Sequence, residues 1–465
     1  MAVDLKKIKK VYVIGIKGSG VVAISEMLTL MGVEVLGSDT NEKFFTDKIL
    51  QKLGIKYFEK FAIENIPEDI DLVIYSTAYN AENNSEFQEA QKRNLPMLSY
   101  PEILAEFFNQ KYGIAVCGTH GKTTTSAMLA EVLRGCKADP SAIIGGKVKN
   151  WDSNALLGKS EFFVIEADEF QNKLKMYEPK IAILTSLDFD HPDTFENFEI
   201  YKEAFADFVS KIPKTGFLVV WGNSIDTLEV SKKANCEIIA YGFNYDCDVK
   251  ITNYKLQVAD DISIQEFEIL FKNENLGKFQ IQLVGKHNVL NAAAVIATCH
   301  KLNLNGEKIK ESLKNFQGTS RRFEYIGKSQ KGALLFDDYG HHPEEIKATL
   351  KATQEVYPEK NLIVIFHPHS YSRTEALLQE FAQSFDAADK VIVLDIYGSA
   401  RESDGKVSSK DLVNLINKYN RDKAEYIPTI AEVIENLSDK ISEQDLVLSI
   451  GAGNSWEVLE KLKEK

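Results

Sequence analysis

Cysteine is scarce in this sequence and is never grouped. Five cysteines are scattered over 465 residues, their number is odd, and no two of them form a C-x-x-C pair. A disulfide framework and a cysteine-rich zinc site both need grouped cysteines, so neither is expected. We therefore expect reduced thiols and a cytoplasmic protein.

Long hydrophobic runs and clusters of basic residues are also missing. No apolar stretch approaches the roughly 20 residues that a membrane-spanning helix needs. The apolar run at residues 11–16 follows several lysines but ends in a glycine loop, so it cannot be the core of a signal sequence. The formal net charge is −13, and no segment gathers the lysine and arginine that bind a phosphate backbone. We expect neither a membrane nor a nucleic acid as partner.

The chain is too long for one hydrophobic core. At about 150 residues per domain, its length corresponds to roughly three domains. Strand-like apolar runs alternate with helical patterns, which is typical of α/β domains. We place the domains at residues 1–108, 109–319 and 320–465. Residues 217–282 differ, because their alternation and turn signals predict antiparallel strands.

Residues 118–125 read GTHGKTTT and carry the strongest functional signal. They follow an apolar run at 114–117 and precede a helical pattern, which is the context of a phosphate-binding loop. Free backbone N–H groups and the positive helix end favour phosphate oxygens, Lys122 adds a positive charge, and Thr123 offers a magnesium ligand. The pattern predicts ATP binding by Gly118, Thr119, His120, Gly121, Lys122, Thr123 and Thr124. A glycine-rich turn without a ligand is the alternative.

The N-terminal unit begins with a strand, a glycine loop and a helix. Residues 15–20 read GIKGSG, and the glycine spacing reverses that of the dinucleotide fingerprint. The reversed spacing argues against a nicotinamide cofactor, whereas diphosphate binding at the helix start is still expected. Later strands lead to Asp39 and Ser76, at the edge where open α/β sheets bind ligands.

Acidic and histidine side chains follow two strand-like runs of the middle unit. Glu166 ends the run that begins at residue 162, where a carboxylate is placed to bind magnesium beside the phosphate loop. His191 follows the run 181–184, and Asp188 and Asp190 beside it favour a functional histidine. A surface acid and a packing histidine are the alternatives.

Two further patterns carry polar groups. His287 and Asn291 are four positions apart and share one helix face, where an asparagine amide can bind an adenine edge; a helix cap is the alternative. Half of the eight histidines fall in two loops that follow strands, DDYGHHP at 337–343 and HPHSYSR at 367–373. Both loops should face one crevice, where Arg373 can fork onto a carboxylate. Structural histidines and a solvated arginine are the alternative.

In this order, the motifs resemble those of the Mur ligase family, the ATP-dependent amide ligases of peptidoglycan precursor synthesis. The resemblance extends over nearly the whole chain. The strings that carry it are GIKGSG, GTHGKTTT, EADE, the Asp-His pair, GKHN, SRRF, DDYGHHP and GAGN. It implies an α/β fold of three domains, with Rossmann-like N- and C-terminal domains and a central P-loop ATPase-type domain. Within the family, the chain looks most like the ligases that act on UDP-N-acetylmuramate and L-alanine.

The resemblance also implies the roles of single residues. In the N-terminal domain, the UDP-sugar would contact Gly18, Ser19 and Gly20 at its diphosphate, and Asp39 and Ser76 near its uridine. In the middle domain, Lys122 would contact the phosphates of ATP, Thr123 and Glu166 one magnesium ion, and His191 a second. His287 and Asn291 would lie near adenine, and Arg322 near the nucleotide. The amino acid and the lactyl carboxylate would face Tyr339, His341, His369 and Arg373.

The implied reaction has two steps. The muramate carboxylate attacks the γ-phosphate to give an acyl phosphate, and the amine of L-alanine then displaces phosphate. Positioning and charge stabilisation supply most of the acceleration, and three ligands on three domains imply hinge closure. The implied catalytic residues are Lys122, Glu166, His191, His341, His369 and Arg373. The partners are small molecules, and the protein is expected as a monomer or homodimer.

Two alternatives stay open. A related recycling ligase joins a tripeptide to the same sugar nucleotide, but its relatives carry extra residues between EADE and the Asp-His pair, and that interval is compact here. A regulator of the same fold that binds nucleotide without turnover is the second alternative, because fold does not imply function.

Overall fold

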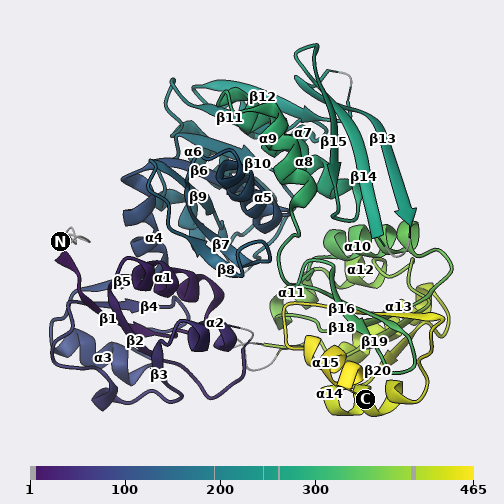
Figure 1. Ribbon diagram of the computed structural model, residues 1–465. Coiled ribbons are helices and arrows are strands. Elements are labelled where there is room, and N and C mark those ends of the chain that lie inside the picture. Colours follow the sequence, from purple (N-terminus) through teal and green to yellow (C-terminus); the bar gives the residue numbers. More distant parts are fainter. Residues whose placement is uncertain are drawn as a thin grey trace.

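The computed structural model describes residues 7–44, 46–192, 194–244, 246–259, 262–398 and 405–464. It forms three lobes in chain order, each built on its own sheet, as Figure 1 shows. The N-terminal lobe (purple) and the C-terminal lobe (green to yellow) lie beneath the middle lobe (blue to teal). The predicted α/β class is confirmed, whereas the predicted domain bounds stay a prediction.

The N-terminal lobe is an open parallel sheet with strand order β3-β2-β1-β4-β5. Val11 and Val13 of β1 face one core cluster, and Tyr12 and Ile14 face another, so the strand is buried on both faces. The strand order reverses between β1 and β4, where such sheets bind ligands. The elements are β1 (Lys10–Ile14), α1 (Ser19–Leu30), β2 (Glu34–Ser38), α2 (Asp47–Lys52), β3 (Lys56–Phe58), η2 (Ile63–Asn65), β4 (Leu72–Tyr75), α3 (Ser85–Lys92), β5 (Met97–Ser99) and α4 (Tyr100–Asn109).

The middle lobe has a ten-stranded sheet in the order β15-β14-β13-β12-β11-β10-β6-β9-β7-β8. Its central strand β6 is apolar and buried, and α5 and α8 pack together against one face of the sheet. The elements are β6 (Tyr112–Cys117), α5 (Lys122–Gly135), β7 (Ser141–Val148), β8 (Ser153–Leu156), β9 (Phe162–Glu166), η3 (Phe170–Met176), β10 (Ile181–Leu184), α6 (Phe198–Ser210), β11 (Phe217–Trp221), α7 (Ile225–Ser231), β12 (Glu237–Gly242), β13 (Val249–Ala259), β14 (Ile262–Phe271), β15 (Glu274–Ile281), α8 (Lys286–Lys301) and α9 (Gly306–Asn315).

The antiparallel prediction for residues 217–282 is wrong for its first part. β11 and β12 are parallel neighbours connected through α7, and β12 also pairs with β13 in parallel. Among the described residues of this stretch, the antiparallel pairs are β13 with β14 and β14 with β15. The seven-residue helix α7 is too short to show a clear helical period, so the alternating pattern around it favours strands. Gly277 lies at a bulge within β15, since the register with β14 shifts there.

The C-terminal lobe is a six-stranded sheet in the order β16-β17-β21-β18-β19-β20, parallel except for the edge strand β16. β21 is buried at all six positions because core clusters cover both faces of the sheet. The elements are β16 (Glu324–Lys328), β17 (Leu334–Asp338), α10 (Pro343–Val356), β18 (Asn361–Phe366), α11 (Tyr371–Ala376), α12 (Leu378–Ala382), β19 (Lys390–Val393), α13 (Ser409–Tyr419), β20 (Ala424–Tyr426), α14 (Ile430–Ser438), β21 (Asp445–Ile450) and α15 (Trp456–Glu464).

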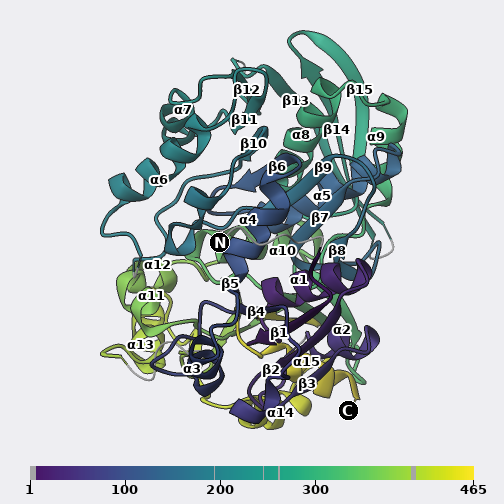
Figure 2. The same ribbon diagram turned by 90° about the vertical axis from the view of Figure 1, so that its left-hand side faces the viewer.

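The lobes touch one another through both apolar and polar contacts. Helix α1 packs on β7 and β8, as Figure 2 shows, and the buried Glu26 of α1 accepts a 2.6 Å hydrogen bond from the Ser153 hydroxyl. Tyr397 of the C-terminal lobe donates a 3.0 Å hydrogen bond to Glu42 of the N-terminal lobe. Over the described ranges, no helix is long and apolar enough to cross a membrane.

Candidate active site

The phosphate loop lies between the end of β6 and the start of α5. Gly118 and Gly121 have φ angles of +124° and +79°, which residues with a Cβ rarely adopt. A Cβ on Gly118 would also collide with the Thr185 hydroxyl. Helix α5 begins at Lys122 with Gly121 as its N-cap, so the first backbone N–H groups of the helix point into the loop. The loop therefore has the backbone that an anion site needs.

Lys122 is held inside the loop by an ion pair. Its ammonium donates to the Gly118 carbonyl at 2.6 Å and to Glu169 at 2.9 Å, and it also reaches the Thr119 carbonyl at 3.1 Å. Burial lowers the pKa of Lys122, but Glu169 and neighbouring carboxylates raise it above its ordinary value. These contacts occupy all three ammonium protons. Lys122 must therefore exchange one of them to bind a phosphate oxygen.

Carboxylates gather at the ends of the strands beside this loop. The Thr123 hydroxyl donates to Glu166 at 3.0 Å, and burial raises the pKa of Glu166. Ligand atoms of Asp168, Glu169 and His191 all lie within 4.8 Å of one another, so they are able to hold a metal ion. The register places these groups together, because Glu166 pairs with Val116 of β6 and Leu184 with Cys117.

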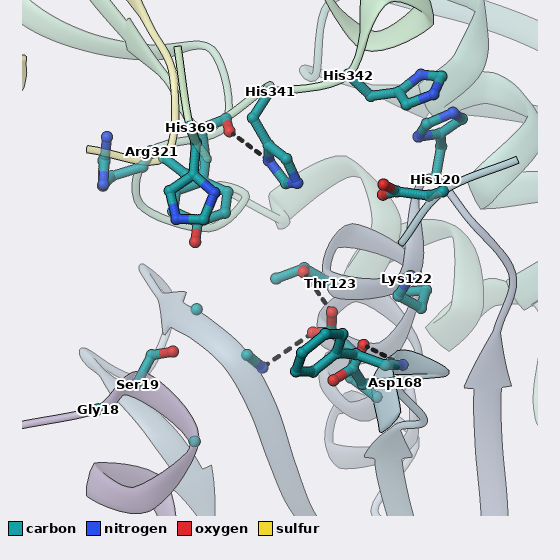
Figure 3. A pocket seen from close by; sticks show the side chains of 18 of the residues that line it. Gly18, Ser19, His120, Lys122, Thr123, Asp168, Arg321, His341, His342 and His369 are labelled. Carbon is teal, nitrogen blue, oxygen red and sulfur yellow. Dashed lines mark hydrogen bonds between the residues drawn. The ribbon is translucent and has the colours of Figure 1, made fainter. Parts of the chain in front are cut away.

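His120 connects the phosphate loop to the C-terminal lobe. Its Nε2 lies 3.3 Å from Asp188 and its Nδ1 lies 3.3 Å from Glu345 of α10, although neither contact is aligned as a hydrogen bond. Burial lowers the pKa of His120, but the two carboxylates together raise it to about 9. The centre of its ring lies 4.8 Å from that of His342, and Figure 3 shows the two rings beside each other at the upper right. A charged imidazolium thus bridges two lobes.

The two histidine loops of the C-terminal lobe face the same space. The rings of His341 and His369 lie 6.2 Å apart, and Nδ1 of His341 donates to the Tyr339 carbonyl at 3.1 Å. Burial, together with the charge of Arg373, lowers the pKa of His341 to about 4. The Arg373 guanidinium donates two hydrogen bonds to Asp190, at 3.0 and 2.8 Å. Arg373 is therefore already paired with a carboxylate of the middle lobe.

All three lobes line one cavity of about 410 Å³. The predicted residues in its wall are Gly18, Ser19, Gly20, Ser76, Thr119, His120, Gly121, Lys122, Thr123, Glu166, His191, Arg322, Tyr339, His341, His369 and Arg373. A second cavity of about 590 Å³ lies between the middle and C-terminal lobes and contains Thr124, His287 and Asn291. His120, Gly121 and Arg322 line both cavities, so the two spaces adjoin.

Comparisons with known proteins agree with this three-lobe arrangement. Residues 10–112 match the model described as "Mur ligase family, catalytic domain", residues 116–299 the "Mur ligase middle domain", and residues 321–453 the "Mur ligase, glutamate ligase domain". The UDP-N-acetylmuramate--L-alanine ligase of Desulfitobacterium hafniense is 39% identical over 97% of this chain and 99% of its own. The chain belongs to the Mur ligase family.

Two solved structures show the same fold as this Mur ligase. The UDP-N-acetylmuramate-alanine ligase of Thermotoga maritima superposes with a TM-score of 0.83 at 26% identity, over 98% of both chains. A murein peptide ligase of Psychrobacter arcticus superposes with a TM-score of 0.74 at 24% identity, over 98% of this chain and 99% of that one. The predicted three-domain Mur ligase architecture is confirmed.

Two predicted residues of this Mur ligase, Gly118 and Asp39, line neither cavity. Gly118 contributes the left-handed backbone of the loop, with its φ of +124°. The Asp39 carboxylate is 4% exposed and accepts the backbone N–H of Lys17 at 2.7 Å and of Thr40 at 2.8 Å. Asp39 therefore helps to order the glycine loop, and its place near the uridine stays a prediction.

Sequence reasoning missed several cavity residues of this Mur ligase. Glu345 follows His342 by three positions and completes a capping box at the start of α10. The usual signature of such a box has Ser or Thr in place of the histidine, so the spacing alone does not indicate it. In the sequence, Asp190 stands out only as a neighbour of His191, whereas in the structure it pairs with Arg373. Phe170 and Lys173 also line the cavity, and nothing in their sequence pattern points to it.

Proposed function

We propose that the chain is an ATP-dependent ligase that joins L-alanine to the lactyl carboxylate of UDP-N-acetylmuramate, with release of ADP and phosphate. The names of the curated relative and the Thermotoga structure support this reaction. The observation that carries the proposal is the single cavity to which the phosphate loop, the GIKGSG loop and both histidine loops contribute. A reaction between three ligands needs such a common space.

ATP would extend through both cavities. Mur ligases are ATP-dependent, and the base would occupy the larger cavity, which contains His287, Asn291 and the half-buried Trp221. The indole N–H of Trp221 is buried and has no hydrogen-bond partner within the described part of the chain. The phosphates would pass Gly121 and reach Lys122.

Magnesium fits the residues beside the phosphate loop. The hydroxyl of Thr123 and a carboxylate oxygen of Glu166 lie 3.0 Å apart, which suits two ligands of one hard cation. His191, together with Asp168 and Glu169, would hold a second ion. When bound, magnesium offsets charge on the transferring phosphoryl group.

The chain's own residues suit both steps. In the first step, a carboxylate oxygen of the sugar forms a bond to the γ-phosphorus and ADP leaves; Lys122 offsets the charge on the transferred group. In the second step, the amine of L-alanine attacks the acyl carbon, phosphate leaves, and the amine loses a proton. With a pKa of about 4, His341 is neutral at pH 7. Because its Nδ1 donates to Tyr339, its Nε2 is left as an acceptor for an amine N–H.

Phosphate release tests the proposed reaction. Purified protein is supplied with ATP, magnesium and UDP-N-acetylmuramate, and L-alanine, L-serine, glycine and the tripeptide are compared as acceptors. We expect release that depends on a free amino acid and is fastest with L-alanine. Release with the tripeptide alone would favour the recycling ligase, and no release with any acceptor would favour a regulator without turnover.

The proposed reaction belongs in the cytoplasm as a step of peptidoglycan precursor synthesis. All five cysteines are free, which fits a reducing compartment. We retain the domain bounds 1–108, 109–319 and 320–465 as part of this proposal, and a monomer or homodimer as the expected state.

A further inference from the structure

The lysine of the GIKGSG loop turns away from the cavity. Lys17 is 1% exposed, and its ammonium donates to the carbonyls of Thr40 and Glu42, each at 2.9 Å, and to the Glu59 carboxylate at 3.2 Å. These partners use all three of its protons. The loop thus offers backbone N–H groups to an anionic ligand but no positive charge of its own.

A different lysine brings positive charge to the same cavity. Lys173, in η3 of the middle lobe, is 7% exposed and lines the cavity together with Gly18, Ser19 and Gly20. Its ammonium donates to Asp168 at 2.7 Å and lies 5.1 Å from the centre of the Phe170 ring. Among the described residues, Asp168 is its one hydrogen-bond partner, so two of its three protons are unfilled.

A buried ammonium with unfilled donors is costly unless a ligand or water completes its hydrogen bonds. The local backbone adds to this cost, because Gln171 and Asn172 both have φ angles of +55° within η3. These two left-handed residues separate Phe170 from Lys173 and let both side chains line the cavity. Such strain persists where the surrounding structure fixes it, and functional sites are a common place.

We propose that Lys173 binds an anionic oxygen of the sugar nucleotide, on its diphosphate or on its lactyl carboxylate. Asp168, which would also be a ligand of the second magnesium ion, is the positioning residue that holds the ammonium through one carboxylate oxygen. Lys173 brings to the cavity the positive charge that Lys17, which turns away, does not provide. It lies on the middle lobe, which also carries Lys122. This inference rests on the proposed function for the identity of the ligand.

Direct binding tests the proposal without turnover. Isothermal titration calorimetry measures the affinity of UDP-N-acetylmuramate and of UDP-N-acetylglucosamine, which has the same diphosphate but lacks the lactyl carboxylate. The proteins are the wild type, Lys173→Met, Lys173→Arg and the control Lys175→Met, which removes an exposed lysine two positions away. We expect Lys173→Met to weaken binding by roughly ten-fold or more, as the loss of a charged hydrogen bond does. Lys173→Arg should retain most of the wild-type affinity, and Lys175→Met should bind both ligands like the wild type.

The two ligands separate the possible contacts. If Lys173→Met loses the same affinity for both ligands, Lys173 contacts the diphosphate. If it loses affinity for UDP-N-acetylmuramate alone, Lys173 contacts the lactyl carboxylate. Unchanged affinity of Lys173→Met for both overturns the inference while leaving the proposed function intact. A wild type that binds ATP but neither sugar nucleotide overturns both. If Lys173→Met does not fold, Lys173→Gln provides the same comparison, since it removes the charge and keeps a donor for Asp168.

Discussion

Single residues of this site differ in charge because their neighbours differ. His120 lies between two carboxylates, which raise its pKa to about 9, whereas burial lowers the pKa of His287, His341 and His367 to about 4. At pH 7, His120 is therefore charged, and the other three are neutral. A neutral histidine has one ring nitrogen that accepts a hydrogen bond, as Nε2 of His287 does from Asn288 at 3.2 Å. The charged His120 connects two lobes.

A histidine titration checks this pattern at the residue scale. We expect NMR of the ring protons to show one histidine with a pKa near 9 that is absent from His120→Asn, and three that stay neutral down to about pH 5. Because the folded pKa of His120 exceeds the unfolded value of about 6.5, its contribution to stability is complete below pH 6.5. That contribution is lost as the pH rises through about 9. A value near 6.5 for His120 would contradict the charged bridge.

At the scale of elements, the start of α10 does more than cap a helix. One oxygen of Glu345 accepts the backbone N–H of His341 at 2.9 Å and lies 3.3 Å from the N–H of His342. The other oxygen faces His120 at 3.3 Å and Arg322 at 3.7 Å. The same capping box on α14, formed by Thr429 and Glu432, is exposed and lies outside both cavities. Glu345, in the first turn of α10, thus contacts both the histidine loop at 337–343 and His120 of the phosphate loop.

A double-mutant cycle tests the interaction between Glu345 and His120. Glu345→Gln keeps an oxygen for the two N–H groups but removes the charge that faces His120. We expect Glu345→Gln and His120→Asn each to lower kcat/KM for the amino acid by about ten-fold, with the double variant little worse than either, since contacting charges couple. The matched control Glu432→Gln should retain wild-type kinetics. If the two reductions in kcat/KM multiply in the double variant, the two residues act independently, and the proposed coupling is contradicted.

The elements themselves were largely readable from the sequence. Apolar runs predicted β1, β6, β9 and β10, and the glycines predicted the loops that follow β1 and β6, because these features are local. The direction of Lys17, the pairing of Arg373 with Asp190 and the entry of Lys173 into the cavity were not readable. Each depends on residues from distant segments. Residue type and spacing predict a charged group, but tertiary packing decides which partner it meets.

At the scale of the whole molecule, three lobes meet around one cavity and hold it with polar contacts. Arg373 joins the C-terminal lobe to Asp190 of the middle lobe, and the pair is buried, so breaking it would leave an uncompensated charge. Glu42 joins the N-terminal lobe to Tyr397, whose ring lies 5.8 Å from that of His369. These contacts hold the three lobes around the cavity, where a reaction among three ligands needs them.

Transfer of an isotope label tests the central claim of acyl-phosphate ligation most directly. UDP-N-acetylmuramate labelled with ¹⁸O in its lactyl carboxylate is incubated with ATP, magnesium and L-alanine, and the released phosphate is analysed by mass spectrometry. If the carboxylate attacks the γ-phosphorus and the amine then displaces phosphate, each phosphate carries one labelled oxygen. Phosphate released without the label would show that water, and not the sugar carboxylate, takes the phosphoryl group, and would contradict the proposed mechanism.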